Sequence, residues 1–432
     1  MHVLLFDMHT GGHHLEYASL LRQELTELWS DIEITILSTV REGHHEEFLD
    51  PETVKYLYDD DVLDRLHPKS ATGHAIRAIR NPRGSIVADA LEYVEERSYD
   101  LVHFLHADDI LKEIYRHGQS IETPIVATIN GSYFRVQTRR RTAIAKRLIE
   151  HGLTDIASTA VPDVFSRRGP WNHVNLHRLA RDNVVKEFFV ASEIGRELIL
   201  SATDIEQYAP LTKIPDPVET WSNEAFDRQS ARDRLDLTEE EYVFTFFGEM
   251  RAEKGVDLLV DALEEYDGSP ITVILAGKPV AVDARKIERG VANPDVTVVP
   301  ELGFVPQEAV PDYFFAADAV ILPYRRSFGT YRTSGVFQKA CSAGRPVIAP
   351  NFGAFAARVS KWNLGTTFEP GSAESLSAVL ASVASNPEGI LDEQSMSEYV
   401  ESQTYGRLAE RSSKTYRRVL GADAGVAHEQ KA

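Results

Sequence analysis

Residues that could bind an anion are concentrated between Val320 and Val347, in the stretch VILPYRRSFGTYRTSGVFQKACSAGRPV. A short apolar run predicts a buried strand, and a helix is expected to begin after a loop. The loop and helix start carry Arg325, Arg326, Arg332, Thr333, Ser334 and Gly335. Ser334 or Thr333 would cap the helix, whose free N–H groups and nearby arginines would form an anion cradle. An ordinary strand, loop and helix with solvated arginines is the alternative that this stretch leaves open.

A second group of chemically useful residues follows the first apolar run, His2–Met8, in the sequence HTGGHH. His9, His13 and His14 stand close together, but adjacent histidines on a loop rarely converge on an ion without carboxylate partners, so no metal site is predicted. Gly11 and Gly12 would let a ligand approach the backbone closely and line a cleft. The stretch has no G-x-G-x-x-G pattern, so a dinucleotide cofactor is not indicated.

Polar residues also follow two expected strands, Leu101–Leu105 and Ile125–Ile129. His106 comes directly after the first and Asn130 directly after the second. Because ligands of open α/β sheets bind beyond the carboxyl ends of the strands, both residues are expected at the crevice. His106, Asn130 and His13 are therefore candidate catalytic residues, although a structural role for His106 remains open.

Strands alternate with helical patterns along the whole chain, which predicts an α/β fold with parallel sheets. Further strands are expected at Ile32–Leu37, Phe188–Val190, Val243–Phe247, Ile271–Ala276 and Val296–Val299. Helices are expected at Leu15–Leu28, Ile86–Arg97, Glu193–Ser201 (capped by Ser192), Val256–Leu263, Ala309–Ala317 and Tyr405–Leu420. The rigid IPDP segment, Ile214–Pro217, precedes an acidic stretch and is the expected boundary. We therefore expect domains at residues 1–213 and 214–400, followed by a helix that packs back and a tail at 401–432.

Composition narrows the range of partners. The 432 residues carry 46 basic and 66 acidic side chains, a formal net charge of −20, which argues against a nucleic-acid partner. The single cysteine, Cys341, excludes a disulfide framework and is expected in the core. No apolar run has the length of a signal peptide or a membrane span, so a cytoplasmic protein is expected. Arginines and lysines between Arg135 and Arg147 could rest on an anionic membrane or grip an anionic acceptor, or form a solvated helix face.

Several ordered motifs in the second half resemble family 4 of the glycosyltransferases, also described as glycosyl transferases group 1. They are IPDPV (Ile214–Val218), FGEMRAEKGVDLLVDAL (Phe247–Leu263), GFVPQEAVPDYFFAADAVILPY (Gly303–Tyr324) and AGRPVIAP (Ala343–Pro350). The first half resembles the family's acceptor domain more weakly, through GGHHLEY, PIVATINGS and FFVAS. The resemblance implies the GT-B fold, in which two doubly wound Rossmann-like domains face each other across a cleft.

By the same resemblance, Lys254 matches the lysine that contacts the donor diphosphate. Glu249 stands where the family has an arginine, and Arg251 follows two residues later. Ser334 and Gly335 would lie near the phosphates, Gly303, Phe304 and Val305 near the base, and Arg325 or Arg332 would add positive charge. The family's two glutamates fall at Tyr331, expected near the donor sugar, and at Lys339, which would point into the phosphate site or into solvent. Asn130 stands where the family has a histidine.

These observations lead to a transferase hypothesis and two alternatives. The main hypothesis is a metal-independent glycosyltransferase, without a cofactor, that moves a sugar from a nucleotide-diphosphate sugar to a glycan or lipid-linked acceptor. Fixed positive charge would stabilise the diphosphate as the sugar leaves. The missing glutamates and histidine motivate an alternative, a degenerate member that binds nucleotide or glycan without transfer. A GT-B epimerase or phosphorylase is the third, less favoured interpretation.

Overall fold

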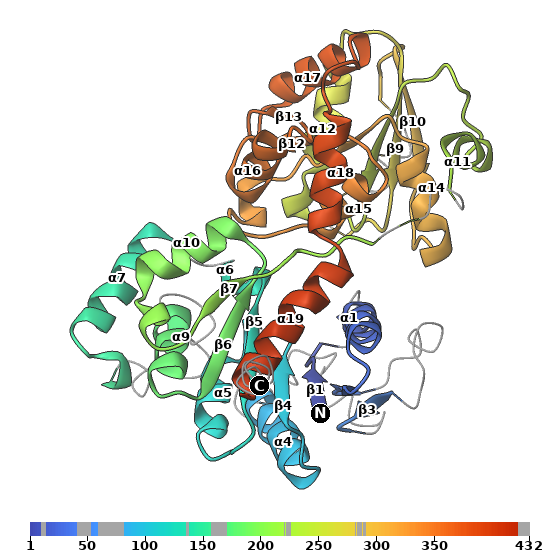
Figure 1. Ribbon diagram of the computed structural model, residues 1–432. Coiled ribbons are helices and arrows are strands. Elements are labelled where there is room, and N and C mark those ends of the chain that lie inside the picture. Colours follow the sequence, from blue (N-terminus) through green and yellow to red (C-terminus); the bar gives the residue numbers. More distant parts are fainter. Residues whose placement is uncertain are drawn as a thin grey trace. The chain divides into compact units, whose positions relative to one another are not determined.

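The computed structural model describes residues 1–9, 14–40, 53–58, 82–134, 138–156, 171–219, 221, 226–280, 282, 287 and 291–421. The chain divides into two compact units (Figure 1). Unit 1 consists of Met1–Pro215 and Tyr405–Ala432, and unit 2 consists of Asp216–Thr404. The chain thus leaves unit 1, builds unit 2, and returns to unit 1 through its last helix. No helix in the described residues combines the length and apolar character that crossing a membrane requires.

Unit 1 is built on a seven-stranded parallel sheet in the order β3-β2-β1-β4-β5-β6-β7. The strands are β1 His2–Phe6, β2 Glu33–Ser38, β3 Val54–Tyr56, β4 Leu101–Phe104, β5 Ile125–Ile129, β6 Val185–Val190 and β7 Leu211–Lys213. The helices are α1 His14–Leu28, α4 Pro82–Glu96, α5 Leu111–Gly118, α6 Gly131–Phe134, α7 Arg139–Glu150, α9 Trp171–Arg181, α10 Glu193–Ala202 and α19 Tyr405–Val419, with a 3-10 turn η3 at Ile205–Gln207. Because β1 and β4 are neighbours, residues that follow these two strands lie at the same edge of the sheet.

The returning helix α19 belongs to the core of unit 1. Its apolar residues Leu408, Ala409 and Tyr416 pack in one cluster with buried residues of α1 and of the sheet. A buried polar pair adds to this packing, because the Tyr416 hydroxyl lies 2.7 Å from Nδ1 of His103 on β4. The buried Glu187 of β6 likewise bonds to side chains of α19. Buried polar groups are costly unless bonded, so these contacts fix α19 on unit 1.

Unit 2 is built on a six-stranded parallel sheet in the order β10-β9-β8-β11-β12-β13. The strands are β8 Val243–Phe247, β9 Ile271–Ala276, β10 Val296–Glu301, β11 Ala319–Ile321, β12 Val347–Pro350 and β13 Gly365–Phe368. The helices are α11 Arg228–Arg234, α12 Val256–Glu264, α14 Val310–Phe315, α15 Gly335–Ser342, α16 Gly353–Trp362, α17 Ala373–Ser385 and α18 Glu393–Ser402, with 3-10 turns η4 Ala252–Lys254, η5 Gln307–Ala309 and η6 Arg326–Phe328. Near-continuous apolar runs such as ITVILA of β9 are buried throughout, as parallel strands covered on both faces require.

The structure confirms most predicted elements. Ile125–Ile129, Val243–Phe247 and Ile271–Ala276 are strands with the predicted bounds. Ser192 caps α10 by accepting a hydrogen bond from the backbone of Gly195, as predicted. The predicted helix at Ala309–Ala317 is shorter in the structure, because α14 spans only Val310–Phe315 and Ala309 ends the preceding 3-10 turn η5. Cys341 is buried in α15, as predicted.

Candidate functional site

A buried lysine lies at the carboxyl end of β8, in unit 2. Lys254 ends the 3-10 turn η4, and Gly255 follows it with a positive φ of 68°. A Cβ at Gly255 would lie 2.0 Å from the carbonyl oxygen of Pro323, so only glycine allows the loop to pass this close to the end of β11. This constraint holds Lys254 in place, with 8% of the residue exposed.

No described residue supplies a counter-ion in direct contact with the charge of Lys254. Among the described residues, its ammonium makes neither a hydrogen bond nor an ion pair, although its nitrogen lies 5.7 Å from the ring centre of Tyr324. Burial and the neighbouring Arg251 lower the pKa of Lys254 to about 8, while the carboxylates of Glu249 and Glu253 act in the opposite direction. Buried charges are normally paired, so an ammonium that no described residue pairs indicates a site for a bound anion.

Other cations and hydroxyls surround this lysine. Arg251 and Arg332 are both close enough to lower the pKa of Lys254 and to affect that of Tyr324. The Tyr324 hydroxyl lies 3.3 Å from Oγ of Ser334, which places the start of α15 beside the same loop. The structure therefore gathers Arg251, Lys254, Arg332 and Ser334, four of the residues predicted to bind a diphosphate. We call these four residues and Tyr324 the cation site.

The start of α15 is open. Ser334 occupies the N-cap position, but its side chain makes no capping hydrogen bond, contrary to the capping that the sequence suggested. A Cβ built at Gly335 would meet no atom within 4 Å. The first N–H groups of the helix therefore have no side-chain cap from Ser334, and the space beside Gly335 is available to a ligand.

The other predicted donor residues have contacts of their own. Arg325 pairs with Asp257 of α12 at 2.6 Å, so its guanidinium is already engaged. Gly303, Phe304 and Val305 follow β10, where the N–H of Gly303 donates to the carbonyl of Gly277. Phe304 is 87% exposed, an unusual state for a large apolar side chain.

The two positions that carry glutamates in the family differ in their surroundings. Tyr331 lies in the loop before α15 and is partly buried. Lys339 forms an ion pair with Glu219 and lies over the ring of Trp221 at 5.3 Å. The sequence suggested that Lys339 would point into the phosphate site or into solvent. In the structure it does neither, because Glu219 and Trp221 hold it.

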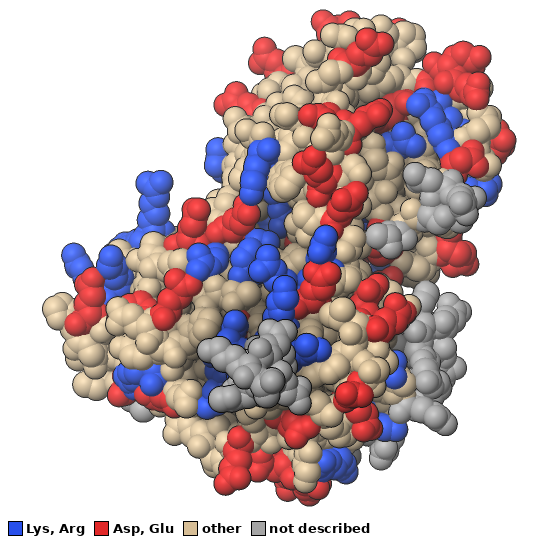
Figure 2. All heavy atoms as spheres, in the orientation of Figure 1, with Lys and Arg blue, Asp and Glu red and all other residues tan. Residues whose placement is uncertain are grey.

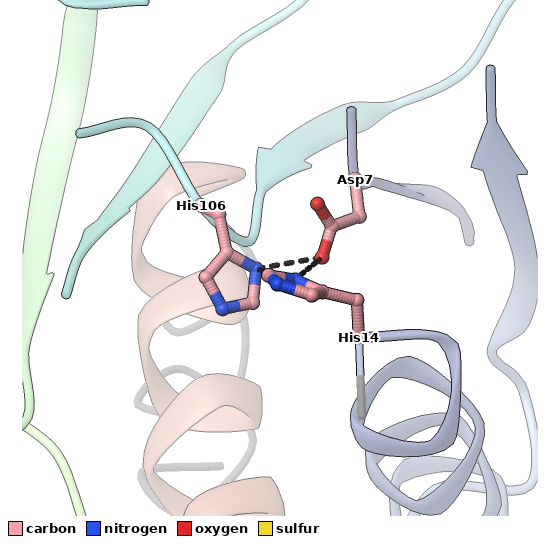
Figure 3. A group of neighbouring side chains, drawn as sticks. All are labelled: Asp7, His14 and His106. Carbon is pink, nitrogen blue, oxygen red and sulfur yellow. Dashed lines mark hydrogen bonds and ion pairs between the residues drawn. The ribbon is translucent and has the colours of Figure 1, made fainter. Parts of the chain in front are cut away.

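In unit 1, three side chains converge at the edge where β1 and β4 end (Figure 3). Oδ2 of Asp7 lies 2.6 Å from Nδ1 of His106 and 3.0 Å from Nδ1 of His14, the first residue of α1. The two Nδ1 atoms are 3.3 Å apart. Asp7 is fully buried, whereas both histidine side chains keep some exposure. We call these three residues the Asp7 cluster.

Charge in the Asp7 cluster is balanced within the cluster. Burial alone would raise the pKa of Asp7, but the two histidines hold it well below its usual range. Burial alone would lower the pKa of His106, but the Asp7 carboxylate raises it above the ordinary value. The neighbouring His9 behaves differently, because burial lowers its pKa to about 4. The charged forms of Asp7 and His106 thus depend on their neighbours in the cluster.

Asn130 is held beside this edge by hydrogen bonds. Its backbone N–H donates to the buried carboxylate of Asp108, and its side-chain amide donates to the carbonyl of Leu105 at 2.9 Å. His13, Gly11 and Gly12 lie outside the described residues.

Sequence reasoning missed Asp7 and Tyr324. Asp7 follows the first strand directly, as His106 follows another, and this shared position at a strand end was the available signal. Tyr324 reads as a core residue from sequence, and it is fully buried. Only the structure shows that its hydroxyl and ring lie beside Ser334 and Lys254.

Comparison with known proteins confirms the resemblance seen in the sequence. Residues 241–386 match the family model described as glycosyl transferases group 1. The chain is 29% identical over 177 residues to the D-inositol 3-phosphate glycosyltransferase of Rhodococcus erythropolis, which is 37% of each chain. It is 26% identical over 184 residues to the GDP-mannose:glycolipid 4-beta-D-mannosyltransferase of Xanthomonas campestris pv. campestris, 42% of this chain and 50% of that one. The chain therefore spans half or less of the length of these curated relatives.

Similar solved structures cover nearly the whole chain. Sucrose-phosphate synthase from Thermosynechococcus elongatus aligns with a TM-score of 0.67 and 15% identity, over 98% of this chain and 99% of that one. Anabaena Alr3699/HepE in complex with UDP aligns with a TM-score of 0.63 and 15% identity, over 96% and 99%. Such low identity shows the fold alone, and that fold is GT-B. The chain thus has the GT-B fold and is related, through its second unit, to the group 1 glycosyltransferases.

Proposed function

We propose that the protein is a glycosyltransferase that moves a sugar from a nucleotide-diphosphate sugar to a glycan or lipid-linked acceptor. Unit 2 would bind the donor, with its diphosphate against Lys254, Arg251 and Arg332 and the open start of α15. The observation that carries this proposal is the buried ammonium of Lys254, for which the described residues supply no direct counter-ion. A diphosphate supplies that negative charge, and the charge grows at the leaving group as the sugar departs.

The acceptor would bind to unit 1. There we keep His106 and Asn130, together with His13, as the proposed catalytic residues. Asp7 fixes Nδ1 of His106 by the 2.6 Å contact, which leaves Nε2 as the nitrogen that could receive the proton of an acceptor hydroxyl. This Asp–His pairing is the general arrangement by which a carboxylate orients a base.

A second candidate function is nucleotide or glycan binding without transfer. It is favoured by one observation: neither carboxylate of the family pattern is present, and Lys339 is held by Glu219 away from a role in catalysis. The cation site would be retained for binding alone.

Thermal unfolding against nucleotides tests donor binding. UDP, GDP, ADP, TDP and their sugars are added to the wild type and to Lys254→Met, which keeps the side-chain volume and removes the charge. UDP and GDP come first, because a structural neighbour was solved with UDP and UDP-glucose and a relative is named for GDP-mannose. At 100 times the dissociation constant, a ligand stabilises the protein by about 2.7 kcal/mol.

The control is Lys361→Met on α16, which removes a lysine from the same unit outside the cation site. We expect one nucleotide to raise the unfolding temperature of the wild type and the control but not that of Lys254→Met. If no nucleotide stabilises the wild type, donor binding is refuted. If a nucleotide binds but no acceptor receives sugar from its sugar derivative, the second candidate function replaces the first.

We further propose that unit 1 contacts an anionic membrane surface through α7, at the cytoplasmic face where lipid-linked acceptors would be met. Arg139, Arg140, Lys146 and Arg147 of α7 are exposed, and Ile144 between them is 42% exposed. Figure 2 shows basic side chains at the left edge of the molecule, where Figure 1 labels α7. Basic residues beside exposed apolar ones are typical of helices that lie on an anionic surface.

Vesicle flotation tests this contact. Vesicles of phosphatidylglycerol should bind the wild type, and vesicles of phosphatidylcholine should not. The double variant Arg140→Ala with Lys146→Ala should lose about 2 kcal/mol of binding, because each basic residue near an anionic surface contributes about 1 kcal/mol. Arg411→Ala with Lys414→Ala, two exposed residues of α19, is the matched control. If both double variants lose the same amount of vesicle binding, the protein is attracted to the anionic surface by its basic residues in general, and α7 has no specific role.

A further inference from the structure

We propose that Asp7, His14 and His106 bind a zinc-class divalent metal ion. The three residues come from separate elements: Asp7 follows β1, His14 begins α1, and His106 follows β4. Their ligand atoms, one carboxylate oxygen and two imidazole nitrogens, all point toward one another (Figure 3). The sequence did not predict a metal here because the histidines lacked a carboxylate partner, and the fold supplies that partner in Asp7.

The distances fit a shared ion. Zinc is bound at about 2.0–2.1 Å by histidine nitrogen and about 2.0–2.2 Å by carboxylate oxygen, so neighbouring ligands in a tetrahedral site lie about 3.3 Å apart. The three ligand atoms here are 2.6, 3.0 and 3.3 Å apart. Displacements of less than 1 Å would therefore bring the shorter contacts to coordination spacing. The 3.3 Å contact already has that spacing.

The surroundings of the Asp7 cluster fix the carboxylate and leave the histidines accessible. The second oxygen of Asp7, Oδ1, accepts a hydrogen bond from the backbone N–H of His9 at 2.9 Å. This bond orients the carboxylate, as partners beyond the ligands commonly do in metal sites. The side chains of His14 and His106 are 21% and 14% exposed, so both histidines lie partly at the surface. Three protein ligands would leave a fourth position for water or a substrate hydroxyl.

The ligand chemistry selects the ion. Two imidazoles and one carboxylate suit zinc and its transition-metal neighbours, whereas magnesium and calcium prefer oxygen ligands. Binding of the ion does not rest on the transferase proposal, because no nucleotide or acceptor is needed. If the protein transfers sugar, the ion changes how unit 1 handles the acceptor proton. Nδ1 of His106 would then be a ligand, and the ion would lower the pKa of a bound hydroxyl in place of the imidazole base.

Metal analysis of the full chain tests the site. Protein stripped with a chelator is dialysed against Zn²⁺, and bound zinc is measured together with its affinity in competition with a chromophoric chelator. Because the chain has 15 histidines, the stoichiometry alone does not locate the ion. His14→Ala and His106→Ala are therefore compared with His117→Ala on α5, a control histidine outside the Asp7 cluster.

We expect one tightly bound zinc per chain in the wild type and in His117→Ala. Removal of a residue that only hydrogen-bonds to a metal ligand typically lowers metal affinity by roughly 10- to 100-fold. His14→Ala and His106→Ala remove a ligand itself, so each should lower zinc affinity by more than that. Excess Mg²⁺ should not displace the zinc. Binding of Co²⁺ to His14→Cys should add a thiolate-to-cobalt absorption band, a signature that a purely structural role of His14 cannot produce. Absence of tight zinc in the folded wild type, or equal affinity in all variants, would overturn the proposal.

Discussion

The cation site of unit 2 and the Asp7 cluster of unit 1 both gather ionisable side chains at strand ends, but they balance charge in opposite ways. Lys254 is buried beside two arginines and has no direct counter-ion in the described residues. The Asp7 carboxylate is buried in direct contact with two histidines that stabilise it. The uncompensated charge of the cation site favours binding of a partner of opposite charge. The paired charges of the Asp7 cluster stabilise that cluster even without a ligand.

The first prediction separates stability from binding at Lys254. Lys254→Met should abolish nucleotide-dependent stabilisation and weaken nucleotide affinity by about 100-fold, since hydrogen bonds to charged groups contribute about 1.5–3 kcal/mol. Without ligand, the same variant should be more stable than the wild type by about 1 kcal/mol, because a buried unpaired charge is removed. Calorimetry with and without nucleotide measures both effects. A loss of stability without ligand would show that an internal partner balances the ammonium.

The second prediction concerns the opposite response of unit 1. Asp7→Asn should destabilise the metal-free protein by about 3 kcal/mol, because it removes the carboxylate charge that contacts His14 and His106. Chemical unfolding in the presence of a chelator measures this change. Asp109→Asn is the control, since that carboxylate lies on the loop that carries His106 but is partly exposed and pairs with Arg83. A neutral effect of Asp7→Asn would mean that the Asp7 cluster does not depend on its charge.

The third prediction uses the pKa of Lys254, which is about 8 in the protein without ligand. Below pH 8 the ammonium is charged and available to a diphosphate, so affinity should be highest there. Above pH 8 affinity should fall by up to about 10-fold per pH unit, as binding then requires uptake of a proton. Titration calorimetry from pH 7 to pH 10 measures the slope. Lys254→Arg, which stays charged over this range, should remove the slope, and a slope that persists in this variant would assign it to another group.

The smallest effect is expected at Glu249, which stands where the family has an arginine. Its carboxylate lies in the loop with Lys254 and opposes an incoming anion. Glu249→Gln should raise nucleotide affinity only about two- to fivefold, because its side chain is 58% exposed and therefore screened. The gain should shrink in high salt. Weaker binding in Glu249→Gln would instead indicate that Glu249 positions Arg251 for the nucleotide.

Unit 2 was more predictable from sequence than unit 1, for a physical reason. The residues of the cation site lie in the segments that follow β8 and β11 along the chain, so local motifs place Lys254 and Ser334 after these strands before the fold is known. Asp7 and His106 are far apart in sequence and meet only because β1 and β4 are neighbours in the sheet. Strand order depends on packing of the whole unit, and a local pattern does not contain it.

Two strands of unit 1 also escaped prediction. β3 and β7 have three residues each and form the two edges of the sheet. Such short strands contain too few alternations for a periodic signal. Lys339 shows a different limit, because its partner Glu219 is distant in sequence and only the folded unit brings them together.

The path of the chain through the two units has a consequence for synthesis on the ribosome. Unit 1 needs α19, yet α19 emerges only after all of Asp216–Thr404 has been made. Unit 2 is one uninterrupted segment and can complete its sheet first. Until α19 emerges, the segment Met1–Pro215 of unit 1 leaves exposed the apolar surface that Leu408 and Tyr416 cover in the folded protein. Nascent chains that stop before Tyr405 would leave His103 and Glu187 without their α19 partners. Such chains would expose apolar surface to chaperones and proteases, so unit 1 is protected from them only once α19 has emerged.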